Sequence, residues 1–281
     1  MIISEVRPSS IAGTWYEGEP ELLKKAVDDF INKANIPELP GEVMAIIVPH
    51  AGHRFSGAVA GHAFSALRGC SPDVVAVISP MHHLYSYPFL TTAHRAYSTP
   101  LGEISVNRLL LDELDKKMQH SLGIGLTKVA NDPEHSLEIE LPFLQRIIKK
   151  EFSLVPVMLC QQTPKTAKKM GEALADILKG QKFLLVASTD LSHFHKQHVA
   201  NTMDKAMLDQ VKAFAPEGIF EIEAEGKGEA CGLGALAAVL WATKALGANC
   251  VKILDYATSG DVTGDYQSVV GYGAAVVLKT K

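Results

Sequence analysis

Several motifs that would assign this chain of 281 residues to a familiar class are absent. The four cysteines, at positions 70, 160, 231 and 250, form no Cys-x-x-Cys pair, so neither a zinc knuckle nor a disulfide framework is expected. Neither the Gly-x-x-x-x-Gly-Lys-[Ser/Thr] phosphate loop nor the Gly-x-Ser-x-Gly nucleophile elbow occurs. The sequence therefore gives no support to a P-loop nucleotide-binding protein or to a serine hydrolase.

Long apolar runs and an excess of positive charge are also missing. No stretch approaches the ~18 apolar residues of a membrane span. The first residues, Met-Ile-Ile-Ser-Glu, lack the basic and apolar segments of a signal peptide. The net charge is −4 and no basic stripe occurs, so neither a membrane nor a nucleic acid is an expected partner. A reducing cytoplasm is the expected location.

The chain does contain an alternation of apolar runs and amphipathic segments. Continuous apolar, β-branched runs predict strands that are buried on both faces, and apolar residues at helical spacing predict helices. The expected strands are 43–48, 74–78, 152–159, 183–187, 251–256 and 268–278, and the expected helices are 57–67, 106–118, 135–150, 163–178, 199–214 and 232–246. Residues 84–106 are expected to be irregular or hairpin-like. No repeat or linker interrupts this order, so we predict one α/β domain over residues 1–281, a three-layer sandwich with a mostly parallel or mixed central sheet flanked by helices.

Seven of the eleven histidines lie in four short segments, and three of these segments directly follow an apolar run. In a βαβ arrangement, ligands bind at the carboxyl ends of the strands. A histidine just beyond a buried strand is therefore placed to act as a metal ligand or as an acid or base. The four segments are 48–57, 79–83, 132–138 and 188–195.

His50 and His82 are the main candidates for metal ligands. They follow the strands predicted at 43–48 and 74–78, which we expect to be parallel neighbours in the sheet. Two imidazoles and one anionic ligand suit a divalent transition metal with open coordination positions. The residues alone leave the third ligand open between Asp190, Glu138 and Cys231. The alternative for any one such histidine is that it only caps a helix or hydrogen-bonds a backbone carbonyl.

Two pairs of polar residues allow both a chemical and a structural interpretation. Asp190 and His193 are three residues apart on a strand-to-helix turn, so they would act as acid or base, or Asp190 would cap a short helix through residues 192–193. His135 and Glu138 would share a helix face if a helix starts there. In that case Asp132 would be its cap.

Cys231 precedes an alanine-rich predicted helix. A helix N-terminus stabilises a thiolate, so we expect a lowered thiol pKa that suits a metal ligand or a nucleophile. The alternative is a small buried cysteine that packs against glycine. The nearby Gly232-x-Gly-x-x-Ala237 segment is similar to a dinucleotide fingerprint, but no strand precedes it, and NAD binding is rejected.

Six segments of the chain form an ordered series of motifs. They are Arg7-Pro-Ser-Ser-Ile-Ala-Gly-Thr-Trp-Tyr16, Pro49-His-Ala-Gly-His-Arg-Phe-Ser-Gly57, Pro80-Met-His-His83, Glu134-His-Ser-Leu-Glu-Ile-Glu-Leu-Pro142, Ser188-Thr-Asp-Leu-Ser-His193 and Ala230-Cys-Gly232. In this order they resemble the motifs of the Memo family. Position 53 departs from the family pattern, which more often has an aromatic residue there, and position 79 departs from a frequent glycine.

The resemblance implies a fold like that of the class III extradiol dioxygenases, which are non-haem iron enzymes. It implies metal ligation by His50, His82 and Cys231, with Asp190 and His193 lining the same pocket. Iron or copper would be the expected metal, with zinc as an alternative. Eukaryotic members act in cell-motility signalling and bind phosphotyrosine peptides, and members have been tied to copper or iron handling. Prokaryotic members often accompany a radical SAM protein, which implies a functional link.

Three functions are consistent with these expectations. The first is a metal-dependent redox enzyme in which His193, Asp190 or His135 moves protons. The second is a non-catalytic module that binds a peptide, a small molecule or another anionic ligand in the old active-site pocket. The third is a protein that carries or buffers a metal. A thiolate in place of a carboxylate changes the charge and softness of the site, so ring-opening chemistry does not follow directly from the resemblance.

Overall fold

Four apolar strands form the centre of the main sheet and run parallel to one another. They lie in the order β2 (Gly41–Val48), β9 (Phe183–Ser188), β3 (Val74–Pro80) and β8 (Ser153–Leu159). Strand β3 is buried along its whole length, as expected for a strand covered on both faces. This computed structural model, which describes residues 5–281, confirms the predicted sheet and its helical layers.

Antiparallel strands at both edges make the sheet a mixed one. On one side, β12 (Val269–Thr280) pairs with β2 and also with β11 (Cys250–Thr258) and β10 (His193–His195), all antiparallel. On the other side, β4 (Phe89–Thr92) is antiparallel to β8, and β7 (Thr127–Val129) is parallel to β4. The parallel centre therefore lies between strands of the opposite sense.

A second, three-stranded sheet holds the first described residues. Its strands are β1 (Val6–Arg7), β5 (Ala96–Thr99) and β6 (Gly102–Ser105). Strand β1 runs parallel to β5, and β5 and β6 form an antiparallel hairpin. The hairpin expected within residues 84–106 is therefore present, together with β4.

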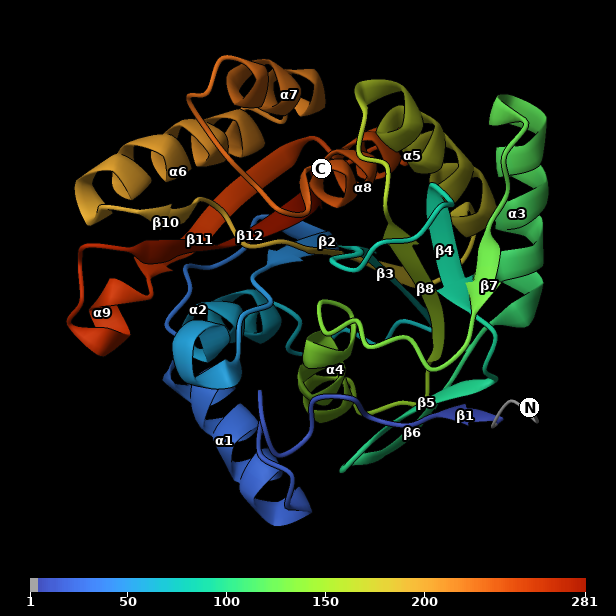
Figure 1. Ribbon diagram of the computed structural model, residues 1–281. Helices are drawn as coiled ribbons and strands as arrows, with labels where there is room; N and C mark the ends of the chain where they lie inside the picture. Colours follow the sequence, from blue (N-terminus) through green and yellow to red (C-terminus); the bar gives the residue numbers. More distant parts are fainter. Residues whose placement is uncertain (1–4) are drawn as a thin grey trace.

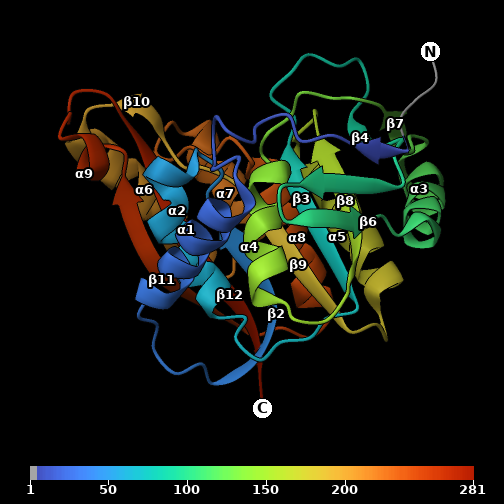
Figure 2. The same ribbon diagram turned by 90° about the horizontal axis from the view of Figure 1, so that it is seen from below.

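Helices cover both faces of the main sheet. Figure 1 shows α1, α2 and α4 on one side and α5 to α8 on the other, and Figure 2 shows the first group from outside. Helix α8 is apolar on nearly all sides because it is buried between α5 and the sheet. The helices are α1 (Pro20–Lys33), α2 (His53–Ser65), α3 (Arg108–Leu122), α4 (Leu141–Ile147), α5 (Pro164–Leu178), α6 (Gln197–Lys212), α7 (Pro216–Ala224), α8 (Leu233–Ala245) and α9 (Gly260–Thr263).

Local sequence signals explain how several of these helices begin. The Thr163 side chain accepts from the Thr166 backbone N–H, and the Thr166 side chain accepts in return from the Thr163 backbone N–H, which makes a capping box. Pro164 occupies the first turn, where its missing N–H costs nothing. Helix α1, which the sequence reading did not identify, buries a regular stripe of Leu23, Val27 and Ile31. Within residues 5–281, no helix is long and apolar enough to cross a membrane.

Three sequence-based expectations are wrong. Strands β2 and β3 are not neighbours, because β9 lies between them. The helix expected at 135–150 is shorter and later: a 3₁₀ turn, η1 (Glu138–Glu140), leads into α4, with Pro142 in its first turn. No helix passes through residues 192–193, because residues 193–195 form β10 and pair with β12. In each case a partner distant in sequence determines the backbone.

The close approach of α5 and α8 gives a stability prediction. A Cβ atom at Gly171 would lie 2.7 Å from the backbone oxygen of Ala238 and 2.7 Å from Cβ of Trp241. We expect Gly171→Ala to lower the free energy of unfolding by about 1–3 kcal/mol through overpacking, although alanine favours an isolated helix. Urea unfolding measures this, with Lys168→Ala on the exposed side of α5 as the control. Equal stability of both variants would contradict the close packing.

Candidate metal centre

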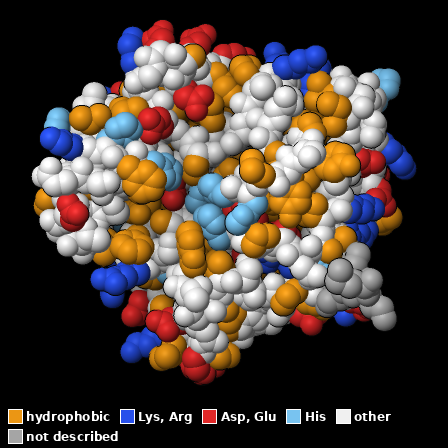
Figure 3. All heavy atoms as spheres, in the orientation of Figure 1, with side chains coloured by type: hydrophobic (Ala, Val, Ile, Leu, Met, Phe, Trp, Pro, Cys, Tyr) orange, Lys and Arg blue, Asp and Glu red, His pale blue; other side chains and the backbone are white. Residues whose placement is uncertain are grey.

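Three histidines from separate segments meet at the carboxyl end of the parallel strands. His50 follows β2, His82 follows β3, and His135 lies in the loop before η1. One ligand atom from each lies within 4.8 Å of the other two. The rings of His82 and His135 stack with their centroids 4.7 Å apart. In the space-filling view, histidine side chains gather near the middle of this face with apolar side chains around them (Figure 3).

Each of these imidazoles has its Nδ1 atom beside an oxygen, which leaves the Nε2 atoms for a metal. His50 Nδ1 lies 2.9 Å from Ser188 Oγ. His82 Nδ1 lies 2.9 Å from Glu134 Oε1, and His135 Nδ1 lies 3.3 Å from the same oxygen. Metal-binding histidines commonly have such a partner on the second nitrogen. The arrangement therefore fits metal ligation.

Burial keeps two of the rings neutral. The pKa of His50 falls well below its usual value, first through burial and then through the nearby His135 and His82. Burial also lowers the pKa of His135 to about 4. A neutral imidazole keeps a lone pair on one nitrogen, so both rings are available as ligands at neutral pH.

Glu134 orients two of the histidines, and sequence reasoning missed this role. Its buried carboxylate accepts the backbone N–H groups of His82 at 2.6 Å, His135 at 3.0 Å and Ser136 at 2.9 Å. Burial alone would raise the pKa of Glu134, but the hydrogen bonds from His82 and Ser136 bring it well below its usual range. The only signal in the sequence is that Glu134 directly precedes His135.

Cys231 contacts the histidine group through His50. Its Sγ atom lies 3.1 Å from His50 Nε2, and the backbone N–H of Asp190 donates to it at 3.3 Å. Burial, with the nearby Asp190 carboxylate, raises the pKa of the thiol well above its usual value. The expected lowering is therefore wrong: α8 begins at Leu233, so the thiol lies before the helix and beside an acid. A bound cation would oppose this shift and favour the thiolate.

Asp190 and His193 both lie next to the histidine group. Asp190 Oδ1 accepts the backbone N–H of His50 at 2.7 Å, and Oδ2 is 4.0 Å from His50 Nε2. Burial raises the pKa of Asp190 to about 7. His193 has a lowered pKa, mainly through burial, with a smaller effect from His82. Asp190 thus supports the segment that carries His50. It caps no helix, so the alternative interpretation of Asp190 as a helix cap is wrong.

Two aromatic side chains stand at the edge of the site. Trp15 is 38% exposed, and its ring centroid lies 4.1 Å from that of His135. Phe194 is 74% exposed and has a φ of 62°, a left-handed conformation that is unusual for an aromatic residue. This backbone turns the ring into solvent beside His193. The centre thus has an exposed aromatic rim, formed by Trp15 beside His135 and Phe194 beside His193.

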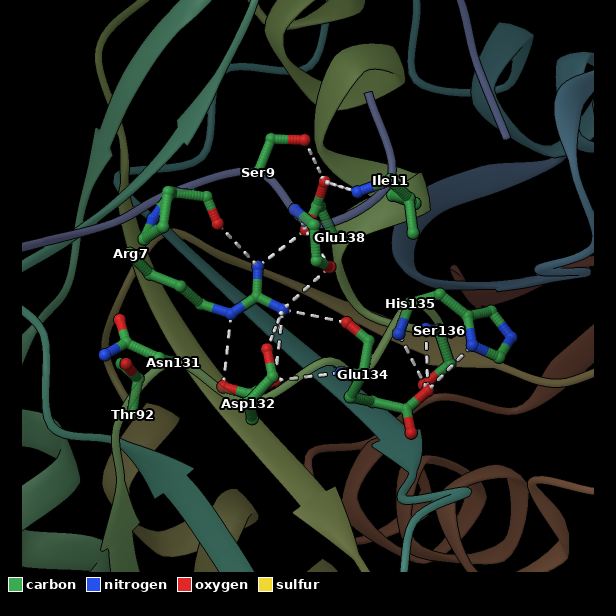
Figure 4. Close-up of polar contacts among 12 residues, drawn as sticks. Arg7, Ser9, Ile11, Thr92, Asn131, Asp132, Glu134, His135, Ser136 and Glu138 are labelled. Carbon is green, nitrogen blue, oxygen red and sulfur yellow. Dashed lines mark hydrogen bonds and ion pairs between the residues drawn. The ribbon is translucent and has the colours of Figure 1, made fainter. Parts of the chain in front are cut away.

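A buried arginine ties the N-terminal segment to the loop that carries His135. The Arg7 guanidinium binds Asp132 through two hydrogen bonds of 3.1 and 3.0 Å, and it binds Glu138 at 2.6 Å (Figure 4). It also donates to the backbone oxygen of Glu134 at 2.9 Å. Asp132 is therefore an ion-pair partner and not a helix cap, and the carboxylate of Glu138 is held by Arg7.

Glu138 provides a pH prediction. Burial would raise its pKa, but Arg7 and the Ser10 backbone N–H lower it. Its stabilising effect is therefore full above the unfolded-state pKa of about 4.3 and is lost as pH falls through the lower folded-state value. We expect Glu138→Gln to cost about 3–5 kcal/mol at pH 7 and clearly less in acid.

Urea unfolding at several pH values measures this difference. Glu103→Gln, at an exposed position in β6, is the matched control and should have little effect at any pH. A constant cost of Glu138→Gln across the pH range would show that Glu138 is not ionised in the folded protein.

Comparison with known proteins gives a consistent result over nearly the whole chain. The family model described as "Memo-like protein" matches residues 7–276. A MEMO1 family protein of Methanopyrus kandleri is 34% identical over 280 residues, covering 96% of this chain and 98% of its own. A MEMO1 family protein of Nitrosopumilus maritimus is 32% identical, with the same coverage of 96% and 98%.

A solved structure supports the fold alone. The crystal structure of an uncharacterized protein from Escherichia coli K12 aligns with a TM-score of 0.52 at 16% identity, and the alignment covers 84% of this chain and 100% of that one. The family match and the relatives that align over nearly their full length show to which family the sequence belongs. The chain belongs to the Memo-like family.

Proposed function

We propose that this protein binds a divalent transition metal between His50, His82, His135 and Cys231 and uses it for redox chemistry on a substrate not yet identified. The observation that carries the proposal is the convergence of three imidazoles from separate segments within 4.8 Å. The thiol 3.1 Å from His50 Nε2 adds a soft donor. Imidazole and thiolate together favour iron, copper or zinc over magnesium or calcium.

The chain's own residues would prepare this site for chemistry. A bound iron or copper ion would supply Lewis-acid and electron-transfer chemistry at its open positions. Glu134 and Ser188 hold the histidine rings in place through their Nδ1 atoms. Asp190 Oδ2 and the half-buried His193 are positioned to hold or move a proton beside the centre. On the resemblance alone, the proposal extends to a radical SAM protein as a functional partner.

A second candidate function is a binding module that keeps the pocket without turnover. The exposed Trp15 and Phe194 at the edge of the centre favour it, because aromatic side chains offer large contact areas at low entropic cost. A peptide or small molecule with an anionic group would then contact the rim and the metal together. Metal carriage without turnover would use the same ligands.

Metal analysis tests the ligand set. We expect protein purified without oxygen to contain iron, copper or zinc, and His50→Ala and His82→Ala to lose nearly all of it, because each removes a ligand. Inductively coupled plasma mass spectrometry measures the content. His83→Ala, at the exposed neighbouring position outside the three-histidine group, is the control and should retain the metal.

Two further variants separate the remaining ligands. If Cys231→Ser loses the metal and His135→Ala keeps it, the ligands are His50, His82 and Cys231, as the family resemblance implies. If His135→Ala loses the metal and Cys231→Ser keeps it, the ligands are the three histidines. Unchanged metal content in His50→Ala and His82→Ala would overturn the site.

Oxygen consumption separates the enzyme from the binding module. We expect metal-loaded protein to consume oxygen with members of a panel of catechols and other phenols, and His193→Ala to be slower by about 10²–10⁴-fold if His193 transfers the proton. A Clark electrode measures the rate. Thr202→Ala, at an exposed position on α6, is the control. No consumption by fully metal-loaded protein would favour the binding module.

A further inference from the structure

Glu140 is a buried carboxyl group that the metal centre does not use directly. Its side chain is 1% exposed, and it ends η1, immediately before α4. Within residues 5–281, its carboxyl group forms a hydrogen bond with Ser188 alone, at 2.9 Å. Its neighbours along the chain differ, because Glu134 accepts three backbone N–H groups and Glu138 pairs with Arg7. Glu140 therefore lacks the partners that an ionised buried carboxylate requires.

The hydroxyl group of Ser188 has more polar neighbours than it has hydrogens. Its Oγ atom lies 2.6 Å from the backbone oxygen of Ser136, 2.9 Å from Glu140 Oε1 and 2.9 Å from His50 Nδ1. A hydroxyl donates one hydrogen and accepts through two lone pairs. It can therefore donate to one of these three neighbours, and the other two must donate to it.

The backbone oxygen of Ser136 decides how the hydrogens are placed. A carbonyl oxygen can only accept, so the Ser188 hydroxyl donates to it across the shortest of the three distances. No other donor to this oxygen occurs within the described residues, so any other assignment would leave it unpaired. Both lone pairs of Ser188 then accept, one from His50 Nδ1–H and one from a protonated Glu140.

We propose that Glu140 is a neutral positioning residue that, through Ser188, fixes His50 as the tautomer with hydrogen on Nδ1 and a free lone pair on Nε2. In a neutral imidazole, one nitrogen donates and the other accepts. The free Nε2 is the atom that lies 3.1 Å from Cys231 Sγ, where the thiol would donate to it in the metal-free protein. The same lone pair would bind the metal.

The electrostatic environment supports this assignment. Burial raises the pKa of Glu140 well above its usual value, and the nearby Asp190 adds to the effect. The side chain of His50 is 1% exposed, and a positive charge at so buried a position is costly, so a neutral His50 leaves no cation on the far side of Ser188 that would stabilise a carboxylate. The assignment of the metal to Nε2 rests on the proposed function, but the protonation of Glu140 and the tautomer of His50 do not.

Infrared spectroscopy and nuclear magnetic resonance test the two parts separately, on full-length metal-free protein at neutral pH. The wild type should show the carbonyl band of a protonated carboxyl group that Glu140→Gln lacks, whereas Glu103→Gln should remove no such band. Long-range ¹H–¹⁵N correlation should show His50 with hydrogen on Nδ1, its signals being assigned from the His50→Ala spectrum. Glu140→Gln should keep this tautomer, because the carboxamide N–H donates to Ser188 as the carboxylic acid would.

Zinc titration calorimetry adds a readout for the metal. Glu140→Gln should stay within about twofold of the wild-type affinity, while Ser188→Ala and Glu140→Leu should weaken zinc binding by about 10–100-fold. Absence of the carboxylic-acid band would overturn the proposal, as would an equal loss of affinity in Glu140→Gln and Glu140→Leu. If Glu140→Leu does not fold, the infrared comparison of the wild type with Glu140→Gln still shows whether Glu140 is protonated. If neither the wild type nor any variant binds zinc, but the carboxylic-acid band and the His50 tautomer are as expected, the proposed metal-binding function is wrong and the inference about Glu140 stands.

Discussion

The ion pairs of Arg7 are the interaction on which the site depends. The guanidinium group of Arg7, which is 1% exposed, binds Asp132 and Glu138 and also donates a hydrogen bond to the backbone oxygen of Glu134. Without that positive charge, two buried carboxylates would lack compensation, at a cost of several kcal/mol each. The loop between them carries His135 to the other two histidines, so the contacts of Arg7 hold in place the segment that completes the group.

Four acidic residues within nine positions of this segment have different partners, and three of them differ in the direction of their pKa shift for that reason. Asp132 and Glu138 face Arg7, and Glu134 accepts backbone N–H groups. Glu140 has only a hydroxyl group beside it. The pKa values of Glu134 and Glu138 are lowered accordingly, whereas that of Glu140 is raised. Sequence position gives no indication of this division, because it comes from residues far away along the chain.

Much of the fold was accessible from the sequence because buried strands and amphipathic helices have local patterns. The runs at 43–48, 74–78 and 183–187 became β2, β3 and β9 with shifts of one or two residues at their ends. The loop at 132–137 was not accessible, since Arg7 holds it from 125 residues away. The raised pKa of Cys231 was not accessible for a similar reason: it comes first from burial in the folded chain and then from the carboxylate of Asp190, which follows β9.

The order of the strands explains why the ring centroids of His50 and His82 lie 5.2 Å apart although β2 and β3 are not neighbours. Because β9 lies between β2 and β3, its carboxyl end delivers Ser188 and Asp190 directly beside His50. Ser188 contacts the ring at Nδ1, and Asp190 accepts the backbone N–H of the same residue. The inserted strand thus supplies the groups that orient His50. Direct pairing of β2 with β3 would have left no strand end between the two histidines to supply these contacts.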